Sequence, residues 1–263
     1  MLLLLSSQLD ALFAPAPEPA RIAFLKGQPY AHRGLHGTSQ GGIILENSPA
    51  AFDAAIKLGH GIECDVQAAE DGTAFVFHDY ELDRLTARQG KLANLRASDI
   101  DQIDLNDGHG KIPRLRAILA QVAGQVPILI EVKSNNMRVG PLCLSVRRAL
   151  EGYTGKAAVM SFNPLVSAWM RRNATHIVRG LVVSEEGRKS LKGRIARHRD
   201  LWTAKPDFLA YDIRDLPSRF AASNRARGLP VLTWTVRSAS QEKIAAMHAD
   251  EPIYEIPQSD QHS

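Results

Sequence analysis

Two short apolar segments that carry charged residues on one face constrain this chain more than any other feature. In a β-strand, alternate side chains point to opposite faces, so a strand over residues 62–66 would place Glu63 and Asp65 together and its apolar residues on the other face. A second strand over residues 74–78 would end at His78. Charged groups beside an apolar core are costly unless a metal ion or an anionic substrate meets them. The two segments therefore indicate a functional site at the ends of neighbouring strands.

From about residue 29 onward, short apolar runs alternate with helical patterns, which is typical of a parallel α/β sheet. The predicted strands cover residues 29–33, 62–66, 74–78, 128–132, 157–161, 177–183, 208–211 and 231–236. The predicted helices cover residues 49–58, 114–122, 142–151, 164–173, 185–202, 217–227 and 240–249. Eight strands separated mostly by single helices, in a chain of 263 residues, predict one (β/α)8 barrel of the TIM type.

Two connections depart from the regular pattern, so we expect a distorted barrel. Too few residues separate Asp65 from His78 for a helical crossover between parallel strands. The segment 79–112, after the third predicted strand, is long for a connection and has weak helical periodicity around residues 97–103. We interpret it as a small insertion over the mouth of the barrel. The predicted organisation is an N-terminal extension over residues 1–27, a single catalytic barrel domain over 28–256 and a C-terminal tail over 257–263.

Composition and charge narrow the classes of ligand and setting. A net charge of +4 and a pI near 9.1 favour an anionic ligand, and because no recognised nucleic-acid motif is present, nucleic acid is not expected as a partner. Two cysteines, Cys64 and Cys143, cannot build a disulfide framework, which predicts a reduced, cytoplasmic setting. The apolar residues 1–5 do not fit a signal peptide, and no run approaches transmembrane length. The basic stretch 188–205 is expected to pack on the barrel as a solvated helix rather than bind a membrane. The oligomeric state is left open.

Charged residues at the ends of other predicted strands would join the same site. His32 and Arg33 end the first strand, and Glu131 and Lys133 end the fourth. The carboxyl ends of all strands of a barrel converge on one rim, where active sites lie. We therefore expect one site that contains His32, Arg33, Glu63, Asp65, His78, Glu131 and Lys133.

The residue types in this set indicate the chemistry. Three carboxylates close together raise one another's pKa unless a hard divalent cation neutralises them, and oxygen ligands favour magnesium or calcium. Arg33 and Lys133 would supply positive charge to a phosphate. His32 and His78 would serve as the acid and base of a proton-transfer pair near neutral pH.

Eight short motifs follow one another in a specific order along residues 29–236. They are Ala31-His32-Arg33-Gly34, Glu46-Asn47-Ser48, Glu63-Cys64-Asp65, His78-Asp79, Ile112-Pro113-Arg114-Leu115, Glu131-Val132-Lys133, Ser161-Phe162-Asn163-Pro164 and Thr233-Trp234-Thr235-Val236. This series resembles the glycerophosphodiester phosphodiesterase family, within the phosphatidylinositol-phospholipase-C-like phosphodiesterase barrels. The resemblance implies a barrel with a small insertion after the third strand, in agreement with the pattern of strands and helices.

The resemblance also implies roles for individual residues. Glu63, Asp65 and Glu131 would hold the divalent metal, with Glu46 near the metal or its waters. His32 and His78 would be the general acid–base pair, and Arg33 and Lys133 would bind the phosphate. Trp234 resembles the aromatic residue on the substrate-alcohol side. The implied reaction is metal-dependent hydrolysis of a glycerophosphodiester, a small molecule, to sn-glycerol 3-phosphate and a free alcohol.

The chain departs from the family pattern at three places. The loop over residues 35–45 is longer and richer in glycine, and Leu45 stands where a proline is common before the Glu-Asn pair, so the position of Glu46 does not follow from the motif. The segment 249–255 lacks the usual Thr-Asp-X-Pro sequence, so no final strand is predicted there and the closure of the barrel stays open.

Several of these residues also have structural interpretations. Ser48 before Pro49 is expected to cap a helix, Trp234 is about as consistent with core packing as with a substrate wall, and Glu131 with Lys133 fits a rim ion pair less well than a functional pair. His36, His60 and His109 are expected to be surface or loop histidines. Two other functions are carried forward: a lysophospholipase D-type enzyme acting on lipids at a membrane, and a catalytically silent phosphate-binding domain.

Overall fold

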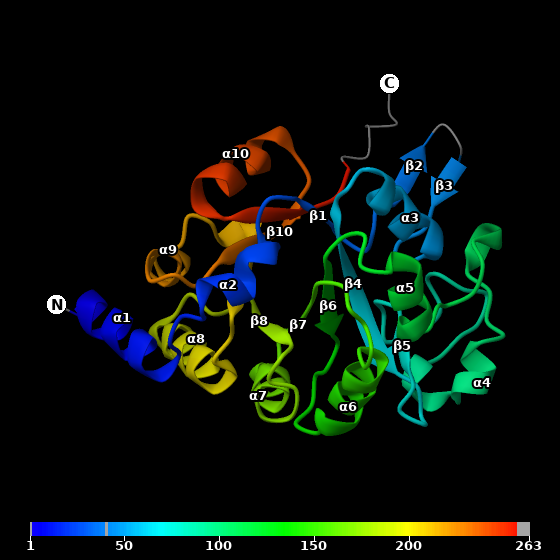
Figure 1. Cartoon of the computed structure of the whole chain (residues 1–263), viewed down its shortest axis with the longest axis horizontal. Helices are drawn as coiled ribbons and strands as arrows, with labels where there is room; N and C mark the ends of the chain where they lie inside the picture. The colour runs from blue at the N-terminus through cyan, green and yellow to red at the C-terminus, as the bar shows by residue number, and fades with distance from the viewer. Residues whose placement is uncertain (1, 40–41, 257–263) are drawn as a thin grey trace.

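Eight parallel strands form a closed barrel at the centre of the molecule, and helices surround it (Figure 1). The computed structural model describes residues 2–39 and 42–256. The barrel closes because Tyr30 in the first strand aligns with Gly61 on one side and with Ile253 on the other. The parallel strands, in barrel order, are β1 (Tyr30–Ala31), β4 (Gly61–Ala68), β6 (Ile128–Val132), β7 (Ala157–Ser161), β8 (Val178–Val183), β9 (Phe208–Asp212), β10 (Val231–Val236) and β11 (Glu251–Tyr254). The predicted fold class is confirmed.

Two strand assignments need correction. The third predicted strand, residues 74–78, is β5 (Ala74–Val76), which pairs antiparallel with β4 and is not part of the closed barrel. The short connection between β4 and β5 explains this, because it can join antiparallel strands but cannot cross over between parallel ones. The eighth barrel strand is instead β11, where no strand was predicted. The sequence does not predict this strand, because Pro252 and the flanking glutamates interrupt its apolar pattern and Ile253 is its one fully buried residue.

The helices pack on the outer face of the barrel (Figure 1). The predicted helix over residues 185–202 begins later, at Leu191, because Ser190 caps it: the Ser190 hydroxyl accepts a hydrogen bond from the amide of Gly193 at 3.2 Å. Residues 184–190 form a loop at the rim instead. The outer helices are α3 (Pro49–Lys57), α5 (Leu115–Val122), α6 (Gly140–Ala149), α7 (Pro164–Asn173), α8 (Leu191–Ala204), α9 (Arg219–Ala226) and α10 (Ala239–His248).

The segment 79–112 builds its own small apolar cluster beside β5. It contains α4 (Ala97–Ile100) and two short 3-10 turns, Leu92–Asn94 and Asn106–Gly108. Its buried side chains, including Leu82 and Ile100, pack with Phe75 and Phe77 of the hairpin. Figure 1 shows this lobe outside β5, at the side of the barrel. The described residues that line the cavity beside His32 come from other parts of the chain, while residues of the lobe such as Arg84 line an adjoining groove that shares His78 and Lys133 with this cavity.

The N-terminal extension closes the end of the barrel opposite the site. It consists of α1 (Leu2–Phe13), α2 (Pro19–Ile22) and a 3-10 turn (Ala23–Leu25). Ile22 and Leu25 are buried with Tyr30 and the barrel-filling side chains, so the extension does more than lie on the surface. Within the described parts of the chain, no helix is long and apolar enough to cross a membrane.

A hairpin of β2 (Gly37–Ser39) and β3 (Gly42–Ile44) occupies the glycine-rich loop after the first strand. Where the loop ends, Asn47 has a φ of 55° and Ser48 caps α3, accepting from the amide of Ala51 at 3.2 Å. The predicted capping role of Ser48 is confirmed. The turn aims Glu46 and Asn47 back toward the barrel rim, where both contact residues of the site.

Candidate active site

The alternation of side chains along β4 and β6 brings three carboxylates together. Cys64, with Ile62 and Val66, packs against the outer helices, as the strand pattern predicts. The parallel register places Asp65 opposite Glu131, and Glu63 lies on the same face as Asp65. One carboxylate oxygen from each of Glu63, Asp65 and Glu131 lies within 4.8 Å of the others, and all three residues are buried.

The positive charges within this cluster come from Lys133 and Arg33. The Lys133 ammonium lies 2.9 Å from Oδ1 of Asp65 and 2.8 Å from Oε1 of Glu131. The Arg33 guanidinium Nε lies 3.2 Å from Oδ2 of Asp65. Burial would raise the pKa of Asp65, but Lys133 and Arg33 outweigh it and hold the pKa below its usual range.

The cluster remains short of positive charge at Glu63. Burial raises the pKa of Glu63 well above its usual range, and the charges of Asp65 and Glu131 raise it further. Burial also raises the pKa of Glu131. Among the described residues, Oε1 of Glu63 is buried and has no hydrogen-bond partner. A buried, unpartnered oxygen within an all-oxygen donor set fits a hard divalent cation.

The turn after β1 supports the carboxylates from the side. Arg33 has a φ of 56°, which directs its backbone N–H to Oε2 of Glu63 at 3.1 Å. Asn47 meets Asp65 twice: its Nδ2 donates to Oδ2 of Asp65 at 2.8 Å, and its Oδ1 accepts from the Asp65 amide at 3.2 Å. Asn47 therefore holds both the backbone of Asp65 and its Oδ2 atom.

Glu46 reaches the site through arginines. Its carboxylate accepts from Arg33 at 2.9 Å and from Arg84 of the lobe at 2.7 and 2.9 Å. Burial opposes ionisation, but these contacts lower the pKa of Glu46. Arg84 also donates from Nε to Oδ2 of Asp79 at 2.6 Å. The same guanidinium thus ties the loop after β1 to the residue next to His78.

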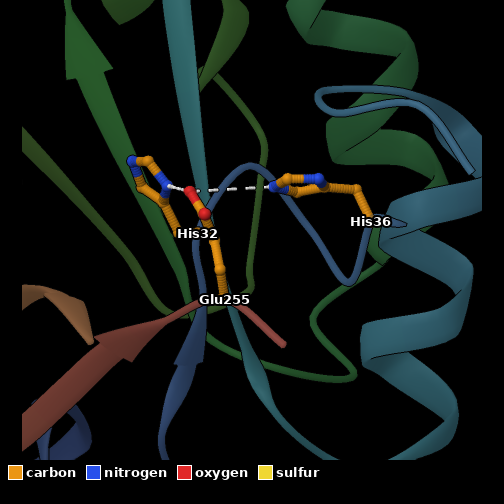
Figure 2. Close-up of side chains that lie close together, drawn as sticks. All are labelled: His32, His36 and Glu255. Carbon is orange, nitrogen blue, oxygen red and sulfur yellow. Dashed lines mark hydrogen bonds and ion pairs between the residues drawn. The ribbon is translucent and has the colours of Figure 1, made fainter. Parts of the chain in front are cut away.

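Each candidate histidine has its Nδ1 atom against a carboxylate. Nδ1 of His32 lies 2.6 Å from Oε1 of Glu255 (Figure 2). Its Nε2 lies 3.9 Å from Oε2 of Glu63. Nδ1 of His78 lies 2.6 Å from Oδ1 of Asp79. Burial lowers the pKa of both His32 and His78, which favours neutral rings at neutral pH.

A cavity of about 420 Å³ opens at this rim. His32 and His78 both line it, as do Lys133 and Arg33, so it reaches every predicted functional group except Asp65, which lies beneath, and Glu46. On its far wall Trp234 donates from Nε1 to the carbonyl of Ala210 at 2.9 Å, and its ring stands edge-on to Phe162 with centroids 5.4 Å apart. The remaining lining side chains are Glu63, Glu131, Met160, Val182, Asp212, Ile213, Arg214, Thr235, Arg237, Gln241 and Ile253.

Sequence reasoning missed four contributors: the amide of Asn47, Asp79 and Arg84 beside His78, and Glu255 beside His32. His78-Asp79 was recognised as a motif, but only its histidine was given a role. Glu255 was missed because β11 was not predicted. The available signal was its position directly after a strand that would complete the barrel, since strand ends carry the site.

Comparison with known proteins places the chain in a family. The model of the glycerophosphoryl diester phosphodiesterase family matches residues 32–251. A Bacillus subtilis protein, YqiK, is 30% identical over 166 residues, which cover 59% of this chain and 66% of that protein. A glycerophosphodiester phosphodiesterase from Caldanaerobacter subterraneus subsp. tengcongensis is 29% identical over 149 residues, covering 53% of this chain and 61% of the relative. The chain therefore spans slightly less than two thirds of the length of these relatives.

The fold comparison covers more of the chain. A phosphodiesterase from Oleispira antarctica, solved in complex with the product sn-glycerol-3-phosphate, superimposes with a TM-score of 0.74. The match covers 88% of this chain and 93% of that structure at 21% sequence identity. At 21% sequence identity, this superposition shows that the two proteins share a fold and shows nothing about function.

Proposed function

The chain belongs to the glycerophosphoryl diester phosphodiesterase family, and from this premise we propose that it hydrolyses glycerophosphodiesters to sn-glycerol 3-phosphate and an alcohol with the help of a divalent cation. One observation carries the proposal. Two histidines, each with Nδ1 held by a carboxylate, line the same cavity as two buried carboxylates and two cationic side chains. This is a constellation for proton transfer around a charged phosphodiester.

Glu63, Asp65 and Glu131 would hold the cation, magnesium or calcium. The unpartnered oxygen of Glu63 and the all-oxygen donor set support this assignment. A bound divalent cation would stabilise negative charge on the phosphoryl oxygens. Glu46 would support the site indirectly, by orienting Arg33.

Arg33 and Lys133 would bind the phosphate. Both side chains line the cavity and both contact Asp65, so their positive charge would lie between the carboxylates and a bound substrate. The guanidinium offers a planar pair of donors, and the ammonium acts as a point charge. Together they would attract an anionic substrate and neutralise the charge that develops as the phosphodiester bond breaks.

His32 and His78 would move the protons. Because a carboxylate occupies Nδ1 of each ring, Nε2 is the atom left to act on the substrate. One ring would take a proton from the attacking nucleophile, either water or the glycerol hydroxyl, and the other would give a proton to the departing oxygen. A neutral ring suits the base, since it can accept a proton, whereas the ring that acts as the acid must first bind a second proton, at Nε2, before it can give one to the departing oxygen.

Trp234 and Phe162 would form the wall on the alcohol side, and the substrate would be a small molecule. The alternative of a lysophospholipase D-type enzyme would need an apolar groove for an acyl chain. A groove does run between the lobe and the barrel from His78, and its lining mixes apolar side chains such as Leu142 and Phe162 with charged ones such as Glu81. The comparison of water-soluble and lipid substrates below decides between the two enzymes. A reducing cytoplasmic setting suits Cys64 and Cys143, both of which are buried free thiols.

The test is release of glycerol 3-phosphate by the purified protein. Glycerophosphocholine, glycerophosphoethanolamine, glycerophosphoglycerol and lysophosphatidylcholine would be compared with magnesium, with calcium and with a chelator. We expect cation-dependent release from the glycerophosphodiesters. No release from any of them with either cation would refute the proposal, and turnover of lysophosphatidylcholine alone would favour the lipid enzyme.

Matched variants assign the residues. Glu63→Gln and His78→Ala are expected to lose turnover while keeping the urea midpoint of the native protein within a narrow range. His109→Ala is the control, because this half-buried histidine belongs to the lobe and does not line the cavity. Near-native rates in either site variant would remove that residue from the mechanism.

A further inference from the structure

The Glu255 side chain lies between two histidines and an arginine at the seam where the barrel closes (Figure 2). It follows β11 directly, and His32 follows β1, the strand that pairs with β11. Figure 2 shows the carboxylate reaching Nδ1 of His32 on one side and facing His36 on the other, where Nε2 lies 3.9 Å away.

Backbone hydrogen bonds hold His32 and Glu255 next to each other. The His32 amide donates to the carbonyl of Tyr254 at 2.9 Å, and the Glu255 amide donates to the carbonyl of Val236 at 3.0 Å. Both residues are therefore held at the ends of adjacent paired strands. A side chain on such a support has few alternative positions.

Arg237 engages both oxygens of the carboxylate. Its Nε donates to Oε2 of Glu255 at 2.6 Å, and its Nη2 donates to Oε1 at 2.9 Å. This fork holds the plane of the carboxylate and leaves Oε1 aimed at His32. The geometry differs from that of a metal-binding cluster, because a guanidinium already occupies both oxygens.

The contact determines which nitrogen of His32 carries the proton. An ionised carboxylate can only accept hydrogen bonds, so Nδ1 at 2.6 Å must be the N–H donor. Burial would raise the pKa of Glu255, but His32 and Arg237 outweigh it and keep the carboxylate ionised. In the neutral ring Nε2 is then the unprotonated atom, and it points toward Glu63 and the cavity.

We propose that Glu255 is a positioning residue: held by Arg237, it fixes the Nδ1–H tautomer and the orientation of His32, so that Nε2 exchanges protons with the substrate. The effect on rate rests on the proposed function, whereas the tautomer of His32 does not. A positioning carboxylate of this kind stabilises the productive state of the ring without touching the substrate.

The deciding variant is Glu255→Leu, which removes the acceptor at similar volume. It frees Arg237, whose side chain is already about half exposed and can turn to solvent. We expect kcat to fall at least about 100-fold with KM changed less than about threefold. Glu186→Leu is the matched control, because Glu186 holds Arg214, another half-exposed arginine of the cavity wall, and contacts no histidine. Its kcat is expected to stay near native.

Nitrogen NMR of the histidine rings reads out the tautomer without any turnover. The nine histidines would be labelled with ¹⁵N, and the His32 signals identified by their loss in His32→Asn. The native protein should show Nδ1–H and an unprotonated Nε2 at His32, and Glu255→Leu should shift the ring toward the Nε2–H form that an unconstrained histidine side chain favours. A native ring with Nε2–H, or a ring unchanged by the substitution, would overturn the proposal even if the enzyme is active.

The conservative variant separates positioning from simple packing. Glu255→Asp keeps the charge but shortens the side chain, and it should retain the Nδ1–H tautomer with kcat between the native and leucine values. If Glu255→Asp shows the Nδ1–H tautomer yet is as slow as Glu255→Leu, the tautomer of His32 does not set the rate, and that part of the proposal is overturned. If the native protein hydrolyses none of the substrates, the proposed function fails while the NMR experiment still decides the role of Glu255.

Discussion

The ammonium of Lys133 lies 2.9 Å from Oδ1 of Asp65, inside a cluster where two further buried carboxylates share its charge. Lys133 lies against the carboxylates and also lines the cavity, so the charge that neutralises Asp65 is the same charge that we propose binds a phosphate. These two roles lead to the first prediction.

Lys133→Met should destabilise the protein in the absence of divalent cations. Removing one partner of a buried charge group leaves uncompensated carboxylates and costs about 3–5 kcal/mol in the free energy of unfolding. Magnesium or calcium should restore much of this loss, because either would neutralise the same oxygens. Urea denaturation with and without each cation measures the effect, with exposed Lys192→Met as the control. An unchanged urea midpoint in the cation-free variant would contradict the role of Lys133.

Asn47→Ala should weaken cation binding, and Ser48→Ala should not. Asn47 fixes the direction of Asp65 through two hydrogen bonds, and losing such support typically costs about 10- to 100-fold in metal affinity. Ser48 caps α3, so its loss should lower the free energy of unfolding by about 1 kcal/mol. Calorimetric titration with calcium or magnesium, next to urea denaturation, separates the two. Equal cation affinities in both variants would argue against support of Asp65 by Asn47.

Arg84→Ala should slow turnover with little loss of stability. The guanidinium connects Glu46 with Asp79, and through them it restrains Arg33 and His78. Its side chain is 47% exposed, so the ion pairs contribute less than about 1 kcal/mol to folding. Loose placement of catalytic groups can still reduce kcat by up to about 100-fold. Arg96→Ala, which loses an exposed pair with Glu70 at 3.9 Å, provides the control and should leave kcat unchanged. Equal kcat values in the two variants would show that Arg84 does not hold the site.

Asp250→Asn should destabilise the protein at neutral pH but not in acid. Burial would raise the pKa of Asp250, yet the Val231 amide at 2.8 Å, Lys26 and Arg225 outweigh it and lower that pKa. A lowered folded-state pKa means that the stabilisation is complete above the unfolded value of about 3.9 and disappears as pH falls through the folded value. The variant should lose about 2 kcal/mol at pH 7.

The measurement is the difference in unfolding free energy between the native protein and Asp250→Asn from pH 7 to pH 3. The difference should shrink below about pH 4. A difference that stayed constant over the whole range would mean that the charge of Asp250 contributes nothing. Asp99→Asn in the lobe, where Asp99 is exposed, serves as the control substitution.

The fold could be predicted from the sequence wherever a strand is a buried apolar run. The strands over 128–132 and 157–161 have the bounds of β6 and β7 because both faces of a barrel strand are covered. β11 could not be found, since Pro252 interrupts a segment in which Ile253 alone is fully buried. Residues 74–76 form a strand as predicted, and the strand ends two residues earlier than expected, but a pattern of side chains does not identify a strand's partner. The length of the connection between β4 and β5 does carry this information, because so short a connection can join antiparallel strands but cannot cross over between parallel ones.

The core of the site could be predicted because it follows from two simple rules. Alternation places Glu63 with Asp65 on one face, and barrel geometry brings that face to His32 and Glu131. The contacts that support the site could not be predicted, because they depend on which side chains meet once the loops have folded. Asn47 reaches Asp65 through a turn with positive φ, and Arg84 reaches Glu46 from a lobe whose position the sequence does not encode locally.

The seam between β1 and β11 also bears on how the molecule assembles. His32 emerges from the ribosome early, and its partner Glu255 is 223 positions later. Contacts of such high sequence separation form late in folding, because the entropy of closing the intervening chain must be overcome first. A nascent chain with seven strands in place would still lack an oriented His32. Recovery of hydrolysis during refolding should therefore lag behind recovery of helical structure, which makes catalysis a reporter of barrel completion.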